Sequence, residues 1–315
     1  MNRRVTVYGA HGHTGSFVVA ELRRRGWAPV PAGREIATVD DPVSLDRLIE
    51  GSAAVINCAG PFLDTAIPLI ESAIRSRVPY VDTAAEQAAV LQVFERYSND
   101  PRAADIVIAP SMAFYGGLGD LMATAAMGDW DRADEICIAV ALDHWHPTRG
   151  TRVTGERNRG KRFIFANGTL ERRDPPPERT WTFPEPFGVE DVVPLTLAES
   201  IVIPRHLRTP DIRVYINARS LEELRDPNTP VPPREGDSTQ IFVMDVIVRR
   251  GREERRVVAR GRDIYASTAP IVVEAMERIV RGESRKQGVV AAGEAFDARD
   301  FLSALNFSIA TSTPE

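Results

Sequence analysis

Three glycines lie at three-residue intervals near the start of the chain, directly after the short apolar run at residues 5–8. Gly9 permits a tight turn, Gly12 lets the backbone approach a pyrophosphate, and Gly15 lets a following helix pack closely on the strand. The helix N-terminus adds N–H donors and a partial positive charge for phosphate groups. The pattern therefore predicts a dinucleotide-binding turn, and an ordinary strand–helix turn is the alternative.

The residues after the second predicted strand, Ala28–Ala32, bear on the choice of dinucleotide. An acidic residue at this point binds the ribose 2′-hydroxyl of NAD, whereas an arginine accommodates the 2′-phosphate of NADP. Arg34 falls at this position, and its guanidinium can also stack on adenine. Glu35 fits NAD instead, and an exposed arginine without a ligand is a further alternative. We expect NADP(H), with Asp40 able to reach an adenine edge.

A turn of small residues follows the buried strand predicted at residues 53–57. Ligands of open α/β sheets bind beyond the carboxyl ends of the strands, so the nicotinamide half of a dinucleotide can pass here. Cys58 lies at this point, and we interpret it as a small buried hydrophobe rather than a nucleophile. The predicted cofactor-binding residues are Gly9, Ala10, Gly12, His13, Thr14, Gly15, Gly33, Arg34, Asp40, Ala59, Gly60, Pro61 and Phe62.

The segment 143–151 holds the densest cluster of polar and aromatic side chains. On an extended strand His144 and His146 point to one face, where they could donate a proton or a hydrogen bond to a substrate. Hydrogen-bonded structural histidines are the simpler interpretation, and we predict no metal site because further ligands are missing. The predicted catalytic residues are His144, His146 and Tyr265, and the predicted substrate contacts are Trp145, Arg149 and Thr151.

These residues need a scaffold, and the first 120 residues supply alternating short apolar runs and amphipathic stretches. Such alternation builds a parallel sheet with helices on both faces, of the Rossmann type, and residues 36–39 are a candidate third strand. After Gly117, strand-like runs separated by long polar loops predict a mostly antiparallel sheet, with residues 202–203 as one short strand and 174–188 and 226–237 as loops. The predicted fold class is α/β, with a second mixed α+β lobe.

The domain prediction follows from this change of pattern. Residues 1–118 form the dinucleotide-binding domain, completed by an apolar-striped helix at 268–281 and by the C-terminal tail, and residues 119–265 form a substrate or dimerisation domain.

Composition excludes several classes of protein. The net charge of −5 over 315 residues argues against a nucleic-acid binder. No run reaches the roughly 18 apolar residues that a membrane span needs, and the N-terminus lacks the apolar core of a signal peptide. The two cysteines fit buried thiols in a reducing compartment, so we expect a cytoplasmic protein.

The chain resembles the saccharopine dehydrogenase-like family of NADP-binding oxidoreductases. The matching stretches are residues 7–15, 32–34, 56–62, 80–86 (YVDTAAE) and 261–275 (GRDIYASTAPIVVEA). The resemblance implies a Rossmann-type lobe, a second lobe with a mixed sheet and a substrate cleft between them. Members of the family reduce imines, carbonyls or activated double bonds with NADPH.

One feature departs from the family pattern. Only Arg34 and Glu35 separate Gly33 from Ile36, whereas a parallel crossover needs a dozen or more residues. The third strand is therefore either lost or paired differently.

The sequence predicts an NADP(H)-dependent oxidoreductase that transfers hydride to a C=N or C=O group of a small molecule. A non-catalytic NADP(H)-binding redox sensor and an enoyl (C=C) reductase are the alternatives. We expect a small-molecule substrate and neither nucleic acid nor membrane as partners, and a homodimer is left open.

Overall fold

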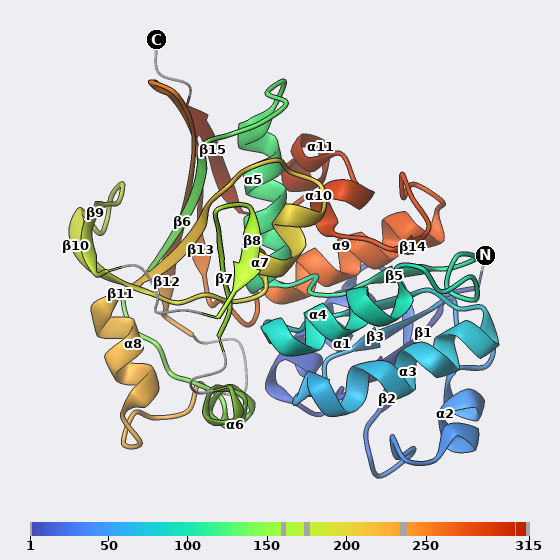
Figure 1. Cartoon of the computed structure of the whole chain (residues 1–315). Coiled ribbons are helices and arrows are strands. Elements are labelled where there is room, and N and C mark those ends of the chain that lie inside the picture. Colours follow the sequence, from blue (N-terminus) through green and yellow to red (C-terminus); the bar gives the residue numbers. More distant parts are fainter. Residues whose placement is uncertain (1, 159–161, 173–176, 234–237, 306, 313–315) are drawn as a thin grey trace. The chain divides into compact units, whose positions relative to one another are not determined.

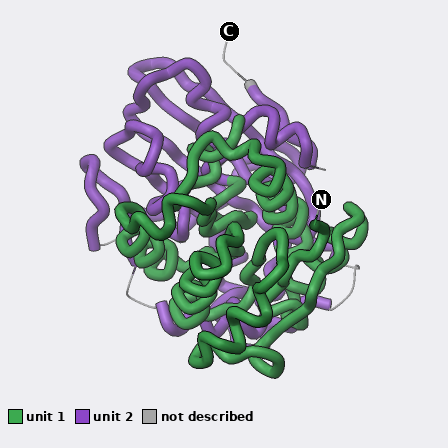
Figure 2. Tube along the Cα trace, turned by 90° about the vertical axis from the view of Figure 1, so that its right-hand side faces the viewer, with its two compact units in different colours: residues 1–118, 265–297 green, residues 119–264, 298–315 purple. Residues whose placement is uncertain are grey.

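The computed structural model describes residues 2–158, 162–172, 177–233, 238–305 and 307–312. The chain forms two compact units, shown in different colours in Figure 2. Unit 1 comprises residues 1–118 and 265–297, and unit 2 comprises residues 119–264 and 298–315.

Unit 1 contains a six-stranded parallel sheet in the order β14-β5-β4-β3-β1-β2 (Figure 1). Its strands are β1 (Arg4–Tyr8), β2 (Ala28–Ala32), β3 (Ala54–Asn57), β4 (Tyr80–Asp82), β5 (Val107–Ala109) and β14 (Gly288–Val289). Its helices are α1 (His13–Arg24), α2 (Pro42–Ile49), α3 (Phe62–Ser76), α4 (Gln87–Tyr97), η1 (Phe114–Leu118), α9 (Thr268–Val280) and α10 (Ala292–Ala295). The predicted Rossmann-type sheet is confirmed.

Helices cover the sheet of unit 1 because their apolar stripes must be buried. Leu45 of α2, Leu69 of α3 and Val93 of α4 belong to one core cluster with Val55 and Ile108 of the strands. On the other side α9 packs against β3, β4 and α1.

β2 is an edge strand, and its sequence explains why no further strand follows it. Ala28 donates its N–H to Arg3, and the carbonyl of Ala32 accepts the N–H of Gly9, so the even-numbered residues of β2 bond to β1 and its flanks. Pro29 and Pro31 therefore face the open edge, where neither has an N–H to donate. The prediction of a strand at 36–39 is wrong, because these residues form a turn that leads towards α2.

The helix α9 returns to unit 1 and is fixed there by a cluster of charges. Arg25, which follows α1, lies 2.5 Å from Glu274 and 2.8 Å from Glu277 of α9, and its Nε lies 2.7 Å from Glu21. The indole N–H of Trp27 also donates to Glu277 at 2.6 Å. Since the Arg25 side chain is only 14% exposed, this is a largely buried ion cluster between distant segments of the sequence.

Unit 2 contains a nine-stranded mixed sheet in the order β15-β13-β12-β6-β11-β10-β9, with β7 and β8 joined through β11. Its strands are β6 (Glu135–Leu142), β7 (Ile164–Ala166), β8 (Thr169–Glu171), β9 (Arg179–Thr182), β10 (Val189–Pro194), β11 (Ile212–Asn217), β12 (Ile241–Arg250), β13 (Glu253–Arg262) and β15 (Ser308–Ser312). Its helices are α5 (Gly119–Met127), α6 (Arg149–Arg157), α7 (Glu199–Val202), η2 (Ile203–Arg205), α8 (Ala218–Arg225) and α11 (Ala298–Ser303). Only β6 and β11 pair in parallel, so the mostly antiparallel prediction is confirmed for the described residues.

The two faces of this sheet are covered differently. α5 packs against β12 and β13, while Trp181 and Phe183 cover alternate residues of β6 on the other face, Cys137, Ala139 and Ala141. The short strand predicted at 202–203 is wrong, because these residues close α7 and open η2. The predicted loop at 174–188 instead contains β9, whereas the described part of 226–237 holds neither helix nor strand.

The C-terminal tail divides between the units. β14 and α10 belong to unit 1, but α11 and β15 belong to unit 2, where β15 pairs with β13. The expectation that the whole tail completes the dinucleotide-binding domain is therefore wrong from residue 298 onward. None of the described helices is long and apolar enough to cross a membrane.

Candidate dinucleotide site and polar pocket

The glycine-rich turn between β1 and α1 is packed tightly at both ends. Gly9 has a φ of +82°, and a Cβ there would lie 2.7 Å from the backbone nitrogen of Ala59. The N–H groups of Gly9 and Ala10 both donate to the carbonyl of Ala32, at 2.8 and 3.1 Å. The turn is thereby held between the carboxyl ends of β2 and β3.

Gly12 and Gly15 have different surroundings. A Cβ on Gly15 would lie 2.1 Å from the carbonyl oxygen of Gly9, so a side chain cannot fit without moving the turn. Among the residues that the structure describes, a Cβ on Gly12 would meet only that carbonyl within 4 Å, at 3.1 Å, and Gly12 is exposed. Gly12 is also the N-cap of α1 and offers no side-chain cap. This leaves room beside the helix N-terminus for a pyrophosphate, so the described residues fit a dinucleotide.

The loop after β3 is fixed by buried polar side chains. The Asn57 side chain accepts the N–H of Ala59 at 3.0 Å, and the Thr65 hydroxyl donates to the Ala59 carbonyl at 2.7 Å. The buried Glu86 carboxylate accepts the N–H of Phe62 at 2.9 Å, at the start of α3. Because a protein carboxylate already occupies this helix N-terminus, the start of α1 is the better place for a pyrophosphate.

Cys58 lies in this loop. Burial raises the pKa of its thiol to about 12, so it is protonated at neutral pH and is a poor nucleophile.

Asp82 joins two segments of unit 1. Its Oδ1 accepts the N–H groups of Ala84 at 3.0 Å and of Ser111 at 2.7 Å, and its Oδ2 accepts the Tyr80 hydroxyl at 2.9 Å. Burial raises the pKa of this carboxyl to about 6, although the two backbone N–H donors act to lower it. Asp82 lies in the stretch 80–86 that resembles the family, but its residue type alone predicts no role. In the structure it ties the end of β4 to the segment that follows β5.

The raised pKa of Asp82 predicts a pH-dependent contribution to stability. An aspartate with an ordinary pKa of 3.8 when unfolded and about 6 when folded stabilises the fold in its protonated form, and this contribution is lost as the pH rises through 6. Asp82→Asn removes this contribution. The free energy of unfolding of the variant should therefore fall below that of wild type by roughly 1 kcal/mol more at pH 5 than at pH 7. Urea unfolding of both proteins at the two pH values measures this, and an equal difference at both would contradict it.

The expected adenine end of the site lies beyond β2. Arg34 and Asp40 are exposed there. The carboxylate of Glu35 folds back over Gly33, since a Cβ on Gly33 would lie 2.6 Å from its Oε2, and its Oε1 lies 3.6 Å from His11 Nε2. Glu35 is thus turned towards His11.

Arg34→Ala tests the selection of the cofactor. A charge-assisted contact is worth about 1.5–3 kcal/mol, so the variant should bind NADPH about ten- to a hundredfold more weakly while its affinity for NADH stays nearly constant. Titration calorimetry with both nucleotides measures the two affinities, with the exposed Arg47→Ala of α2 as the control. Equal losses for NADPH and NADH would mean that Arg34 only stacks on adenine.

Tyr265, predicted as catalytic, lies against a predicted cofactor residue within unit 1. Its ring meets the His13 imidazole edge to face, with centroids 5.1 Å apart. Phe17 packs on His13 at the same distance and angle. The structure therefore brings Tyr265 beside the start of α1.

The other two predicted catalytic residues follow β6 in unit 2. The rings of His144 and His146 lie 4.7 Å apart, and His144 Nδ1 lies 3.0 Å from Asp143 Oδ1. Desolvation, and secondarily the neighbouring His144, lower the pKa of His146. A carboxylate that orients an imidazole is a common arrangement for proton transfer. Asp143 was not predicted as a partner of His144, although it begins the polar and aromatic segment 143–151.

The predicted substrate contacts have structural partners. Trp145 is buried, and its backbone N–H donates to Glu223 at 2.5 Å. Thr151 supplies the N–H that Thr148 caps at the start of α6, where Arg149 is exposed. Their contact with substrate stays a prediction.

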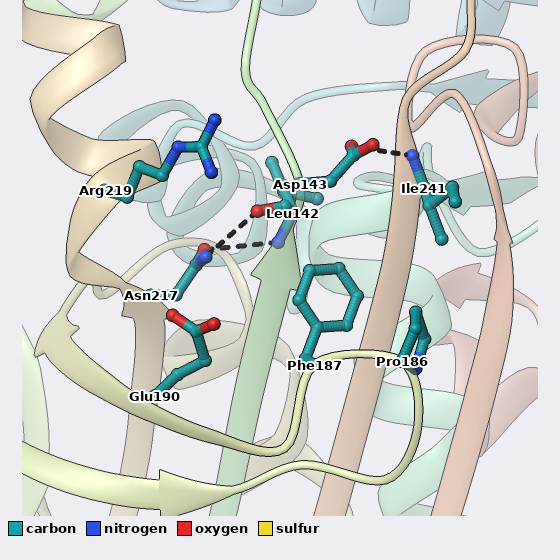
Figure 3. A pocket seen from close by; sticks show the side chains of 8 residues that line it. All are labelled: Leu142, Asp143, Pro186, Phe187, Glu190, Asn217, Arg219 and Ile241. Carbon is teal, nitrogen blue, oxygen red and sulfur yellow. Dashed lines mark hydrogen bonds between the residues drawn. The ribbon is translucent and has the colours of Figure 1, made fainter.

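A pocket of about 380 Å³ lies in unit 2 where β6 and β11 end (Figure 3). Asp143 borders it and so belongs both to the pocket and to the pair with His144. The lining residues are Leu142, Asp143, Pro186, Phe187, Glu190, Asn217, Arg219 and Ile241. The described residues contain no group of three metal-ligating side chains.

Comparisons with known proteins agree with this architecture. Residues 27–105 match the model of the saccharopine dehydrogenase NADP binding domain. The structure resembles apo saccharopine dehydrogenase (L-Glu forming) from Saccharomyces cerevisiae, with a TM-score of 0.65 and 10% identity over 98% of this chain and 100% of that one. It also resembles an engineered D-amino acid dehydrogenase bound to NADP⁺, with a TM-score of 0.53 and 14% identity over 97% of both chains. No curated protein sequence matches the chain.

The matched NADP-binding domain, together with a fold that is shared with two dehydrogenases, supports an NADP(H)-dependent oxidoreductase in the general sense. The match over residues 27–105 supports, for this part of the chain, the resemblance to the saccharopine dehydrogenase-like family that the sequence indicates.

Proposed function

We propose that the protein transfers hydride between NADP(H) and a C=N or C=O group of a small molecule. The observation that carries this proposal is the packing of the glycine turn. Gly9 and Gly15 are enclosed by backbone, whereas Gly12 at the start of α1 is exposed, and its Cβ would meet one backbone atom of the described residues within 4 Å. The match to an NADP-binding dehydrogenase domain supports the same choice of cofactor.

The cofactor supplies the hydride when bound, and the chain must then hold it and provide a proton. We assign the holding of the pyrophosphate to the first turn of α1 and the shaping of the site beside it to the loop 59–62. His144 would donate a proton to the nitrogen or oxygen as the carbon receives hydride. Asp143, whose Oδ1 lies 3.0 Å from His144 Nδ1, would orient the imidazole.

A turnover assay with His144→Ala tests this assignment. NADPH consumption is followed with a panel of cyclic imines, ketones and enones. Loss of one general acid should lower kcat about 10²–10⁴-fold and leave the dissociation constant for NADPH unchanged. His206→Asn is the control, because His206 bonds to buried Asp120 at 2.6 Å and should affect thermal stability rather than kcat.

The outcomes separate the alternatives. Turnover of enones alone would indicate a C=C reductase. Binding of NADPH without turnover of any compound in the panel would favour the redox sensor. Unchanged kcat in His144→Ala would remove the proton-donor role and leave the oxidoreductase assignment standing.

A further inference from the structure

The pocket in unit 2 has one apolar wall and one charged wall. Phe187 and Pro186, from the loop between β9 and β10, supply the apolar wall together with Leu142 and Ile241. The Phe187 ring packs on Phe183, with centroids 6.3 Å apart, and on the core cluster beneath it. The aromatic wall is therefore held in place by the core.

Two polar side chains of the pocket are already used by the protein. The amide of Asn217 donates to the Leu142 carbonyl at 2.9 Å and accepts the Leu142 N–H at 3.1 Å (Figure 3). Arg219 lies 3.5 Å from Glu223 on the next turn of α8, and its side chain is 67% exposed. The charge of Arg219 is thus offset by its neighbour and screened by solvent.

The two carboxylates of the pocket retain capacity for a ligand. Asp143 uses Oδ1 for its side-chain contacts. This oxygen accepts the backbone N–H groups of Ile241 and His144 and lies 3.0 Å from Nδ1 of the His144 ring. Glu190 lies within hydrogen-bond or ion-pair distance of no side chain among the described residues, although it is half-buried and borders the pocket. The lining of the pocket therefore carries two negative charges and one largely offset positive charge.

We propose that this pocket binds a small organic ammonium ion that carries an apolar group. The ammonium would pair with Glu190, or with Oδ2 of Asp143, and the apolar group would lie on the Phe187 ring and Pro186. A carboxylate paired with an ammonium forms a charge-assisted hydrogen bond, and the face of an aromatic ring also attracts a cation. The volume of about 380 Å³ suits a molecule with one ring. This site goes beyond the proposed function, because it requires neither hydride transfer nor bound nucleotide.

The test uses the full chain and three probes of one shape: benzylamine, benzyl alcohol and phenylacetate. Benzylamine, a cation at pH 7, should bind saturably in calorimetric or NMR titrations, and benzyl alcohol should bind at least tenfold more weakly. Glu190→Gln should weaken benzylamine about tenfold or more, which is the value of one charge-assisted contact, and should leave benzyl alcohol unchanged.

Asp191→Asn is a matched control. It makes the same change of charge one residue along β10, on the opposite and exposed side of the strand. Its affinity for benzylamine should equal that of wild type, and circular dichroism should show that both variants are folded.

Absence of saturable benzylamine binding to wild type, or equal affinity in Glu190→Gln, would overturn the proposal, as would tighter binding of phenylacetate. If the site holds, benzylamine kinetics distinguish its use. Competition with the substrate of the reaction would make the pocket a substrate site, and a change of kcat without competition would make it an effector site.

Discussion

Replacement of Gly12 by valine is expected to lower the affinity for NADPH about a hundredfold in a protein that still folds. The valine side chain would project into the open space beside the start of α1, where the pyrophosphate is expected. Loss of contacts to one charged phosphate group at about 1.5–3 kcal/mol accounts for a change of this size. Titration with NADPH measures the affinity, and a thermal melt establishes that the variant is folded.

Two further glycines serve as controls for this prediction. Gly15→Val should fail to fold correctly, because its Cβ would lie 2.1 Å from the Gly9 carbonyl oxygen. Gly155→Val in α6 should affect neither folding nor NADPH, since no other segment of the described chain places a heavy atom within 4 Å of its Cβ position. Wild-type NADPH affinity in folded Gly12→Val would show that the dinucleotide does not cross this turn.

Arg25→Met should destabilise unit 1 by about 3–5 kcal/mol. Removing one partner of a buried ion cluster leaves charges without compensation, and here Glu274 and Glu277 of α9 would lose their shared cation. Methionine retains most of the apolar stem of arginine, so the loss in free energy of unfolding reports the removal of the charge. Urea unfolding followed by intrinsic fluorescence gives the difference in free energy of unfolding.

The adjacent arginine provides a matched control. Arg24 also pairs with Glu21, at 2.7 Å, but its side chain is 59% exposed. Exposed pairs contribute about 0–1 kcal/mol, so Arg24→Met should be nearly neutral. Equal losses from both substitutions would mean that burial does not strengthen the Arg25 cluster.

Local patterns sufficed to predict much of the fold. The glycine turn, the strand at Ala28–Ala32 and the helix starting at Thr268 each carry their signal within a few residues, because strand alternation, helix periodicity and turn chemistry are local properties. The position of β2 at the edge of its sheet could also have been predicted, since prolines at alternate positions of a strand indicate an edge. The short connection after Gly33, taken alone, is compatible with either a lost or a differently paired third strand.

The site was less predictable because its partners are distant in sequence. Asp82 bonds to Ser111, and Asp143 bonds to Ile241, across separations that no motif encodes. The pocket draws residues from β6, the β9–β10 loop, β10, β11, α8 and β12. Only the three-dimensional pairing of β6 with β11 and β12 brings these together.

The prolines of β2 also bear on self-association. An unpaired edge strand is a template on which a second chain can add and start an aggregate. Pro29 and Pro31 present no N–H on that edge, so an incoming strand cannot form the full set of backbone hydrogen bonds. The opposite edge, β14, has only two residues, which is too short to nucleate pairing. Edge-to-edge association of the unit 1 sheet is therefore disfavoured on both sides. Prolines remove the N–H donors at the β2 edge, and the β14 edge is too short for stable pairing.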